Sequence, residues 1–311
     1  MPARHSLTDG VFSVILFVNG FNRSGTTVMQ EAVAAATGGT AFTVGDLIAH
    51  GSPPMAAALH AIVTSAAPVD RGVDRRPVTA SLPEEYGWLL LDTPAGRRST
   101  RFRPAVAAQL HRVVDSIAQR GDPVVMKNPH DFGLEAELLD SFPAAKMIVV
   151  RRNLPAVIDS SYRAMTRLAA SRRYLLALTN NSRWVRFMLW ADGHGASAAI
   201  VRFVTRWALR GEVLIRMRTV SRLPPDRVAF LDYDEMTADP HRGAHWASHL
   251  LDAPCLAREF GAAHSLPVSP KVAASWIDRR VDRYWADVWD RLRRDQLRRG
   301  VIVPTGTGAT A

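Results

Sequence analysis

Cysteine and lysine are both scarce in this chain. Of its 311 residues only one is a cysteine, Cys255, which excludes a scaffold stapled by disulfides and is typical of proteins from reducing compartments. The 39 basic residues include three lysines, Lys127, Lys146 and Lys271, and the other 36 are arginines. This rarity makes each lysine a candidate for a specific role.

Long apolar runs are also missing from the first part of the sequence. The longest early run covers residues 11–18, whereas a membrane-spanning helix needs about 20 apolar residues. The run leads straight into a glycine loop and lacks the small-residue cleavage site of a signal peptide. We therefore expect a buried strand there, no transmembrane segment, and a cytoplasmic protein.

Acidic residues are outnumbered, 29 against 39, which gives a net charge of +10. Residues 163–222 alone hold 12 arginines against Asp192 and Glu212. A basic region this concentrated attracts anions, such as nucleic acid, an acidic membrane surface, or a phosphorylated or sulfated ligand.

Apolar residues make up 47% of the chain, enough for a core, so a disordered protein is excluded. Strand-like and helix-like segments alternate between residues 11 and 170, which predicts an α/β fold with a P-loop-like parallel sheet flanked by helices. We expect one domain over residues 1–311, with a basic helical insertion at 163–222 and a flexible tail at 303–311. The expected strands cover 11–18, 123–126, 145–150 and 228–231. The expected helices cover 26–37, 55–66, 105–119, 132–141, a stretch beginning after Pro155, much of 171–222, and 275–299.

The last of these helices carries two sets of large side chains. Apolar residues recur at helical spacing in one set: Ile277, Val281, Tyr284, Val288 and Leu292. An aromatic set overlaps it: Trp276, Tyr284, Trp285 and Trp289. We expect the aromatic side chains to pack inside the protein rather than to form a binding platform.

A glycine loop follows the first expected strand. Gly20 and Gly25 have the spacing of a P-loop that binds nucleoside triphosphates, but Thr26 stands where the lysine of such a loop would be. The cation of this loop is Arg23. Backbone N–H groups at the start of a helix attract anions, so the loop is expected to hold a phosphate in a different way from a nucleotide hydrolase.

The run Arg-Ser-Gly-Thr-Thr at residues 23–27 resembles the 5′-phosphosulfate loop of the sulfotransferases, usually Pro-Lys/Arg-Ser-Gly-Thr-Thr. Its arginine makes it similar to the tyrosylprotein and bacterial branches of that family. The resemblance implies that the chain uses 3′-phosphoadenosine-5′-phosphosulfate (PAPS) and releases PAP, its desulfated form. It also implies that the phosphosulfate is bound by the five residues of the run: Arg23, Ser24, Gly25, Thr26 and Thr27.

Three further segments resemble sulfotransferase motifs, in the same order. Arg152 ends a strand and Ser160 follows it by eight residues, as in the family's 3′-phosphate motif. A guanidinium can hold a phosphate through two bonds and a hydroxyl adds a third. Residues 125–130 with 138–143 are similar to the Lys-x-Pro and Phe-Pro segments of the family. Residues 228–240 resemble a stretch whose tyrosine, here Tyr233, lies near the adenine.

The resemblance also implies catalytic roles. Sulfuryl transfer builds charge on the oxygen between sulfur and the leaving phosphate, and Arg23 and Lys127 are the candidates that stabilise it. The acceptor hydroxyl needs a base. Two positions compete for this role, Asp46 and His130, and another residue, such as His50 or Glu84, stays open.

Some features depart from the family or match nothing in it. We find no C-terminal Arg-Lys-Gly loop for the 3′-phosphate, and Lys271 is a weak substitute. Residues 163–222 match no known motif. We interpret them as an acceptor or lid region, with a solvated arginine face as the alternative. His241 and His245 lack a nearby carboxylate pair, so we expect no metal site. The acceptor is expected to be a small molecule, a sugar or a lipid.

Two rival functions remain. A P-loop-like kinase would use residues 89–94 as an aspartate-bearing strand end for Mg²⁺, but the missing loop lysine argues against it. A basic nucleic-acid-binding module would use residues 163–222, with Tyr174, Trp184, Trp190 and Trp207. No recognised nucleic-acid motif accompanies them and their spacing fits a core, so we do not expect a nucleic-acid partner.

Overall fold

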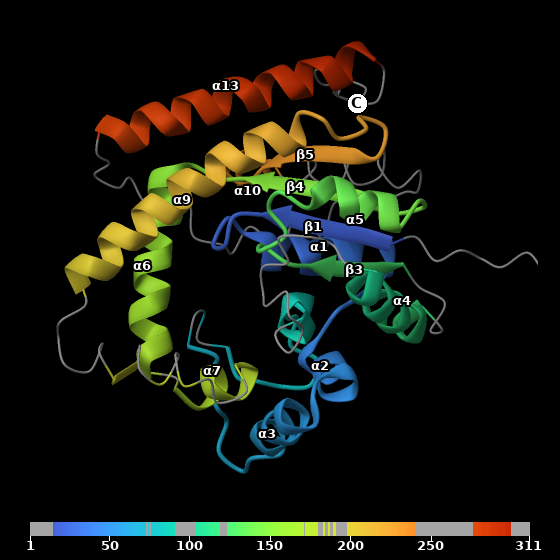
Figure 1. Ribbon diagram of the computed structural model, residues 1–311, viewed down its shortest axis with the longest axis vertical. Helices are drawn as coiled ribbons and strands as arrows, with labels where there is room; N and C mark the ends of the chain where they lie inside the picture. Colours follow the sequence, from blue (N-terminus) through green and yellow to red (C-terminus); the bar gives the residue numbers. More distant parts are fainter. Residues whose placement is uncertain are drawn as a thin grey trace, which may run out of the picture.

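The protein is described by a computed structural model (Figure 1). It describes residues 15–72, 74, 76–90, 104–118, 123–170, 172–179, 183, 186, 189–190, 198–239 and 276–299. Several residues named above lie outside these ranges: Trp184, His241, His245, Cys255, Lys271 and the tail at 303–311. Residues 11–14 of the first expected strand, and 91–94 of the possible kinase segment, lie outside them too.

The core of the fold is a parallel sheet with the strand order β2-β3-β1-β4-β5. Its strands are β1 (Ile15–Gly20), β2 (Thr40–Ala41), β3 (Val124–Lys127), β4 (Lys146–Arg151) and β5 (Val228–Asp232). The register pairs Val18 with Lys127 and Gly20 with Val150. The carboxyl ends of β1, β3 and β4 therefore meet at one edge. The chain leaves β1 toward β2 on one side and leaves β4 toward β5 on the other, and open α/β sheets bind ligands at such a point.

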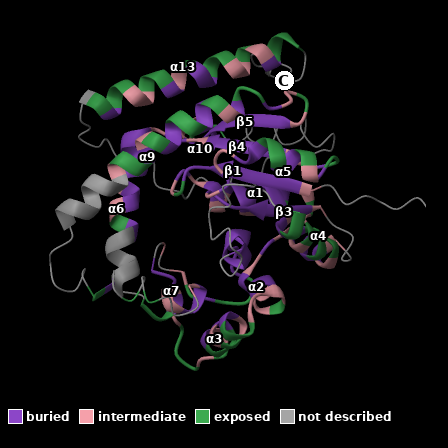
Figure 2. Ribbon diagram, in the orientation of Figure 1, coloured by how far each residue is buried: buried purple, intermediate pink, exposed green. Residues whose placement is uncertain are grey.

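Alternate residues of each strand enter separate apolar clusters on the two faces of the sheet. Phe17 and Val149 belong to one cluster, and Val18 and Ile148 belong to the other. Both faces are thus covered, which explains why the strands read as continuous apolar runs. Figure 2 shows β3 and β5 buried, together with most of β1 and β4, while β2 at the edge is only partly buried. The predicted α/β fold with a parallel sheet between helices is confirmed.

Helices surround this sheet. The α-helices are α1 (Thr26–Thr37), α2 (Val44–His50), α3 (Pro53–Val63), α4 (Pro104–Ala118), α5 (Glu135–Ser141), α6 (Leu154–Ala170), α7 (Arg172–Leu178), α9 (Ala198–Val220), α10 (Tyr233–Ala238) and α13 (Trp276–Arg298). A short 3₁₀ helix, η1, covers Tyr86–Leu90. The first cluster takes residues from α2, α3, α4, α6, α9 and α13, and the second takes residues from α1 and α10. Figure 1 shows α3 beside α2 and α7, and α9 beside α13.

The helix after the glycine loop has the predicted bounds, from Thr26 to Thr37. It ends where Gly38 takes a left-handed conformation, with φ of 63°. Other boundaries differ from the prediction. Strand β1 includes Gly20, and α5 begins at Glu135 because a turn occupies the preceding residues.

Four short elements were not predicted: β2, α2, η1 and α10. Helix α2 has seven residues and is fixed by a capping box between Thr43 and Asp46. Element η1 has five residues, all buried. Short elements of this kind carry too few apolar repeats for a period to stand out.

Helix α13 buries only part of its aromatic set. Trp285 and Trp289 are 0% and 1% exposed and pack against one another, as expected. Tyr284 is 55% exposed, so the expectation that it packs inside is wrong. The indoles of Trp285 and Trp289 occupy the buried face of α13, and Tyr284 lies on its exposed face. Within the described ranges, no helix is both long and apolar enough to cross a lipid bilayer.

Part of the positive charge at 163–222 is paired with acidic side chains in the structure. Arg206 and Arg210 pair with Asp278 of α13, at 3.3 Å and 2.6 Å, and Arg216 is fully buried. Acids from distant elements therefore neutralise part of this charge. Helix α6 runs through residue 163 without a break.

Candidate functional site

The glycine loop joins β1 to α1 at the carboxyl edge of the sheet. Arg23 and Gly25 both have left-handed backbone conformations, with φ of 73° and 96°. Ser24 closes the turn, since both its backbone N–H and its hydroxyl donate to the carbonyl of Phe21. A left-handed arginine is uncommon, and such backbone strain concentrates at binding sites.

Tyr233, the first residue of α10, covers this loop. A β-carbon on Gly25 would lie 2.2 Å from the Tyr233 ring, so only glycine fits at this position. The same ring contacts Arg152, whose guanidinium carbon lies 4.5 Å from the ring centroid. Tyr233 is thus held between the loop and the residue that follows β4.

The two predicted 3′-phosphate residues contact the loop directly. Arg152 donates from Nη1 to the carbonyl oxygen of Arg23 at 3.0 Å. Arg23 in turn donates from Nε to the hydroxyl of Ser160 on α6 at 3.3 Å. Residues separated by more than 100 positions therefore meet at one place, as the sequence predicted.

Lys127 ends β3 beside the same loop. Its ammonium lies 2.8 Å from the hydroxyl of Thr27 and 3.7 Å from a carboxylate oxygen of Glu85. The other oxygen of Glu85 lies 3.9 Å from Nε2 of His130. Lys127, His130 and the loop are thereby brought together around Glu85.

The electrostatics of this region favour an anion. Burial lowers the pKa of Arg23, and the charges of Arg71 and Arg152 lower it further, while Asp74 and Glu85 raise it. Burial also lowers the pKa of Lys127, with Glu85 opposing it and Arg71 adding to it. Buried cations that repel one another are stabilised when an anion binds among them.

Asp46 has a different environment from the other predicted site residues. It lies in the first turn of α2, where its Oδ2 accepts from the backbone N–H and from the hydroxyl of Thr43, both at 2.8 Å. Its own N–H contacts the Thr43 hydroxyl at 3.4 Å. These contacts give Asp46 a role in stabilising α2. A catalytic role for Asp46 stays a prediction.

A protein-family model described as "Sulfotransferase family" matches residues 16–252, about three quarters of the chain. This match spans β1, the glycine loop, Lys127, Arg152, Ser160 and Tyr233. The chain belongs to the sulfotransferase family. A search among curated proteins found no match.

Solved sulfotransferase structures are also similar to the chain. Sulfotransferase STF9 from Mycobacterium avium has a TM-score of 0.52 and 16% identity, over 95% of this chain and 79% of that chain. STF1 from Mycobacterium tuberculosis has a TM-score of 0.46 and 15% identity, over 91% and 76%. A sulfotransferase from Alicyclobacillus acidocaldarius has a TM-score of 0.39 and 14% identity, over 90% and 94%. The similarity to STF9 supports the fold of this sulfotransferase.

Sequence reasoning missed two charged residues of the candidate site. Glu85 lies between Lys127 and His130, and Arg71 influences the pKa of both Arg23 and Lys127. Both lie in a segment with no strong period, and only the fold brings them to the loop. Two adjacent acidic residues at 84–85 were the feature of the sequence that could have pointed to Glu85.

Glu84, the neighbour of Glu85, has a separate set of partners in this sulfotransferase. It pairs with Arg71 at 3.1 Å and accepts from Tyr174 of α7 at 2.6 Å and from the Trp88 indole at 3.2 Å. These contacts connect Glu84 to α7 and η1. A role for Glu84 as the base stays a prediction.

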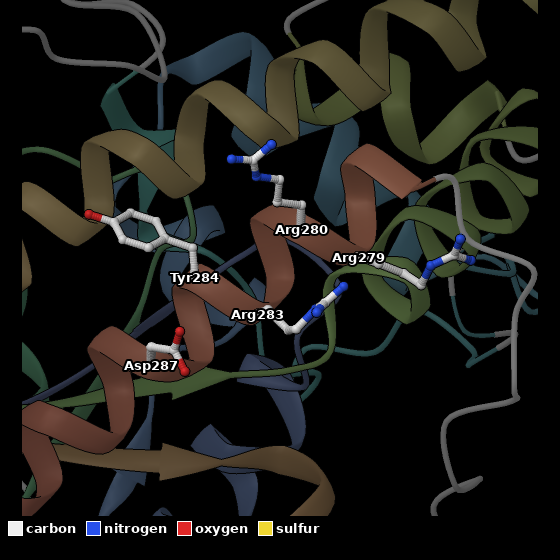
Figure 3. Close-up of a pocket in the computed structure, with 5 residues that line it drawn as sticks. All are labelled: Arg279, Arg280, Arg283, Tyr284 and Asp287. Carbon is white, nitrogen blue, oxygen red and sulfur yellow. The ribbon is translucent and has the colours of Figure 1, made fainter.

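A basic hollow of about 550 Å³ lies on α13. Its described lining comes from that helix alone: Arg279, Arg280, Arg283, Tyr284 and Asp287 (Figure 3). None of the predicted site residues of this sulfotransferase is among them. In the described part of the chain, no three His, Cys, Asp or Glu side chains are grouped closely enough to hold a metal ion.

Proposed function

We propose that this chain transfers a sulfuryl group from PAPS to a hydroxyl group of a small molecule, a sugar or a lipid. The observation that carries the proposal is the convergence of Arg152 and Ser160 on the glycine loop through Arg23. Membership of the family indicates that the reaction is sulfuryl transfer. The convergence of Arg152 and Ser160 on the loop suits a donor that carries phosphates at both ends of its ribose.

Two groups of residues hold the donor. The loop residues Ser24, Gly25, Thr26 and Thr27, at the start of α1, bind the phosphosulfate through their N–H groups and hydroxyls. Arg152 and Ser160 bind the 3′-phosphate, and Tyr233 lies against the adenine. PAPS supplies the sulfuryl group that is transferred.

The cations Arg23 and Lys127 stabilise the negative charge on the bridging oxygen. Both cations are largely removed from water, so water screens their charge weakly. Each therefore stabilises a nearby negative charge more strongly than it would on the surface. The bond from Lys127 to Thr27 ties this ammonium to the first turn of α1 at 2.8 Å. Such preorganisation is the main contribution that a protein makes to a transfer of this type.

His130 is the proton acceptor that the geometry favours. Its Nε2 lies 3.9 Å from a carboxylate oxygen of Glu85, and it lies in the turn that follows Lys127. A carboxylate beside an imidazole stabilises the charged form that results from accepting a proton. Asp46 is the second candidate. We further propose that residues 163–222 contribute to the acceptor site.

The test is transfer of labelled sulfate from PAPS to a panel of phenols, sugars and lipid hydroxyls, with a chelator present. Labelled product that forms without metal supports the proposal. Transfer of phosphate from ATP that requires Mg²⁺, with no transfer from PAPS, would overturn it in favour of the kinase. Binding of any oligonucleotide that weakens steeply with salt, without transfer, would favour the nucleic-acid module.

A further inference from the structure

A buried arginine from α9 lies beneath the candidate site. Arg216 is 0% exposed, and each of its five N–H groups has an acceptor. Its Nε donates to Glu212 at 2.9 Å, and its Nη1 donates to Asn19 and, at 3.3 Å, to Glu135. Its Nη2 donates to the carbonyls of Gly20, at 2.8 Å, and Pro129, at 2.6 Å.

The two carbonyls belong to the two halves of the site. Gly20 is the last residue of β1 and the first of the glycine loop. Pro129 lies between Lys127 and His130, in the turn after β3. One nitrogen of Arg216 therefore bridges the donor loop and the turn that carries the proposed catalytic residues.

Each half is held internally by other contacts. Ser24 closes the loop through the carbonyl of Phe21. The turn is closed by Asn128, which donates to Asp131 at 2.6 Å. The pairing of Val18 with Lys127 in the sheet and the Lys127–Thr27 bond also link the two halves, and Arg216 adds a single nitrogen that binds a carbonyl of each.

Only an arginine can make this set of contacts. Its planar guanidinium presents five donors at fixed angles, whereas a lysine presents three from one nitrogen. Glu212 and Glu135 place negative charge beside it, which compensates the burial of its own charge. The residue therefore suits a role that depends on geometry more than on charge alone.

We propose that Arg216 is a positioning residue, which sets the placement of Lys127 and His130 relative to the phosphosulfate loop. This inference rests on the proposed function of the loop and of Lys127. Because a misplacement of about 1 Å can cost about 100-fold in rate, a lysine at this position should slow sulfuryl transfer far more than it weakens donor binding.

The test compares Arg216→Lys with Arg227→Lys. Arg227 lies at the opposite, amino-terminal edge of the sheet and also holds backbone carbonyls, those of Leu139, Phe142 and Ala145. For each variant, the PAP dissociation constant, the melting temperature and the single-turnover conversion of PAPS to PAP are measured, with the best acceptor of the panel or with water.

We expect both variants to melt earlier than wild type. Arg216→Lys should convert PAPS about 100-fold more slowly, with PAP affinity within about fivefold of wild type, because the loop keeps its internal contacts. Arg227→Lys should keep wild-type rate and affinity. Should Arg216→Lys not fold, Asn19→Ala removes one acceptor of the same guanidinium and should slow conversion roughly tenfold.

A wild-type rate in folded Arg216→Lys, or an equal loss in Arg227→Lys, would overturn the positioning role. A wild-type chain that neither binds PAP nor converts PAPS would instead overturn the proposed function. These outcomes separate the two claims.

Discussion

Arg152 donates a hydrogen bond to the carbonyl oxygen of Arg23 while its guanidinium lies over the ring of Tyr233. One side chain at the end of β4 thus contacts the loop after β1 and the residue after β5, the two neighbouring strands of the sheet. Its position is fixed from two sides. The order of the strands in the sheet therefore determines which side chains of the site contact one another.

Gly25 and Gly38 form a matched pair at the two ends of α1. Both have left-handed conformations, but a β-carbon on Gly25 would strike Tyr233, whereas one on Gly38 would meet nothing within 4 Å. We expect Gly38→Ala to cost about 1 kcal/mol of unfolding free energy and to leave PAP affinity unchanged. Gly25→Ala should cost more and weaken PAP binding roughly 100-fold. Urea unfolding and calorimetry measure both, and equal affinities would refute the packing of Tyr233 on the loop.

Lys127 should matter for rate more than for binding. We expect Lys127→Met to lower PAPS turnover by about 100- to 1,000-fold, since a buried cation beside the loop is lost, with PAP affinity within about tenfold of wild type. Lys146, at the start of β4 and so at the opposite edge of the sheet, is the control. Lys146→Met should keep the wild-type rate. A Lys127→Met variant that turns over normally would remove this residue from the mechanism.

His130 and Asp46 can be separated by their effects on rate and on stability. His130→Ala should lower acceptor-dependent turnover by about 100-fold or more and leave PAP binding nearly intact, because a general base contributes at least that much. Asp46→Ala should mainly destabilise the protein, by about 1 kcal/mol, through the lost capping box with Thr43. Steady-state kinetics and thermal unfolding distinguish them. Wild-type rates in both variants would mean that neither residue is the base.

The stability of the protein should depend on pH through Asp131. Burial raises the pKa of this carboxyl from 3.8 to about 7, although hydrogen bonds from Tyr86 and Asn128 oppose the rise. Between these values the folded state keeps a proton that the unfolded state releases. The stability that it contributes is therefore complete below pH 3.8 and is lost as pH rises through about 7.

Asp131→Asn resembles the protonated carboxyl and cannot titrate. Between pH 5 and pH 8 the wild type should lose more unfolding free energy than Asp131→Asn does. Urea unfolding at both pH values measures this difference. Parallel losses in the two proteins would contradict the raised pKa of Asp131.

The parts of the site that could be predicted from the sequence are those with local signals. The spacing of Gly20 and Gly25, and that of Arg152 and Ser160, is each set within one strand–helix unit. In the structure Arg152 and Ser160 both contact Arg23, which lies between the two glycines. The bounds of α1 follow from a breaker-free run that ends at Gly38.

The parts that could not be predicted depend on contacts between distant segments. Glu85 reaches Lys127 across 42 positions, and Arg216 reaches Gly20 across 196. Nothing in the sequence around residue 216 separates this arginine from the others of the basic stretch, which was interpreted as one acceptor region. Its complete burial and its bonds to the carbonyls of Gly20 and Pro129 distinguish Arg216, and both are properties of the fold.

The central claim is recognition of a nucleotide with a 3′-phosphate by Arg152, and calorimetry with PAP and with AMP, in the presence of a chelator, tests it most directly. Wild type should bind PAP far more tightly than AMP. Arg152→Ala should lose about 1.5–3 kcal/mol for PAP and little for AMP, because charged hydrogen bonds to the 3′-phosphate disappear. Equal affinities for PAP and AMP, or ATP binding that appears only with Mg²⁺, would contradict the account.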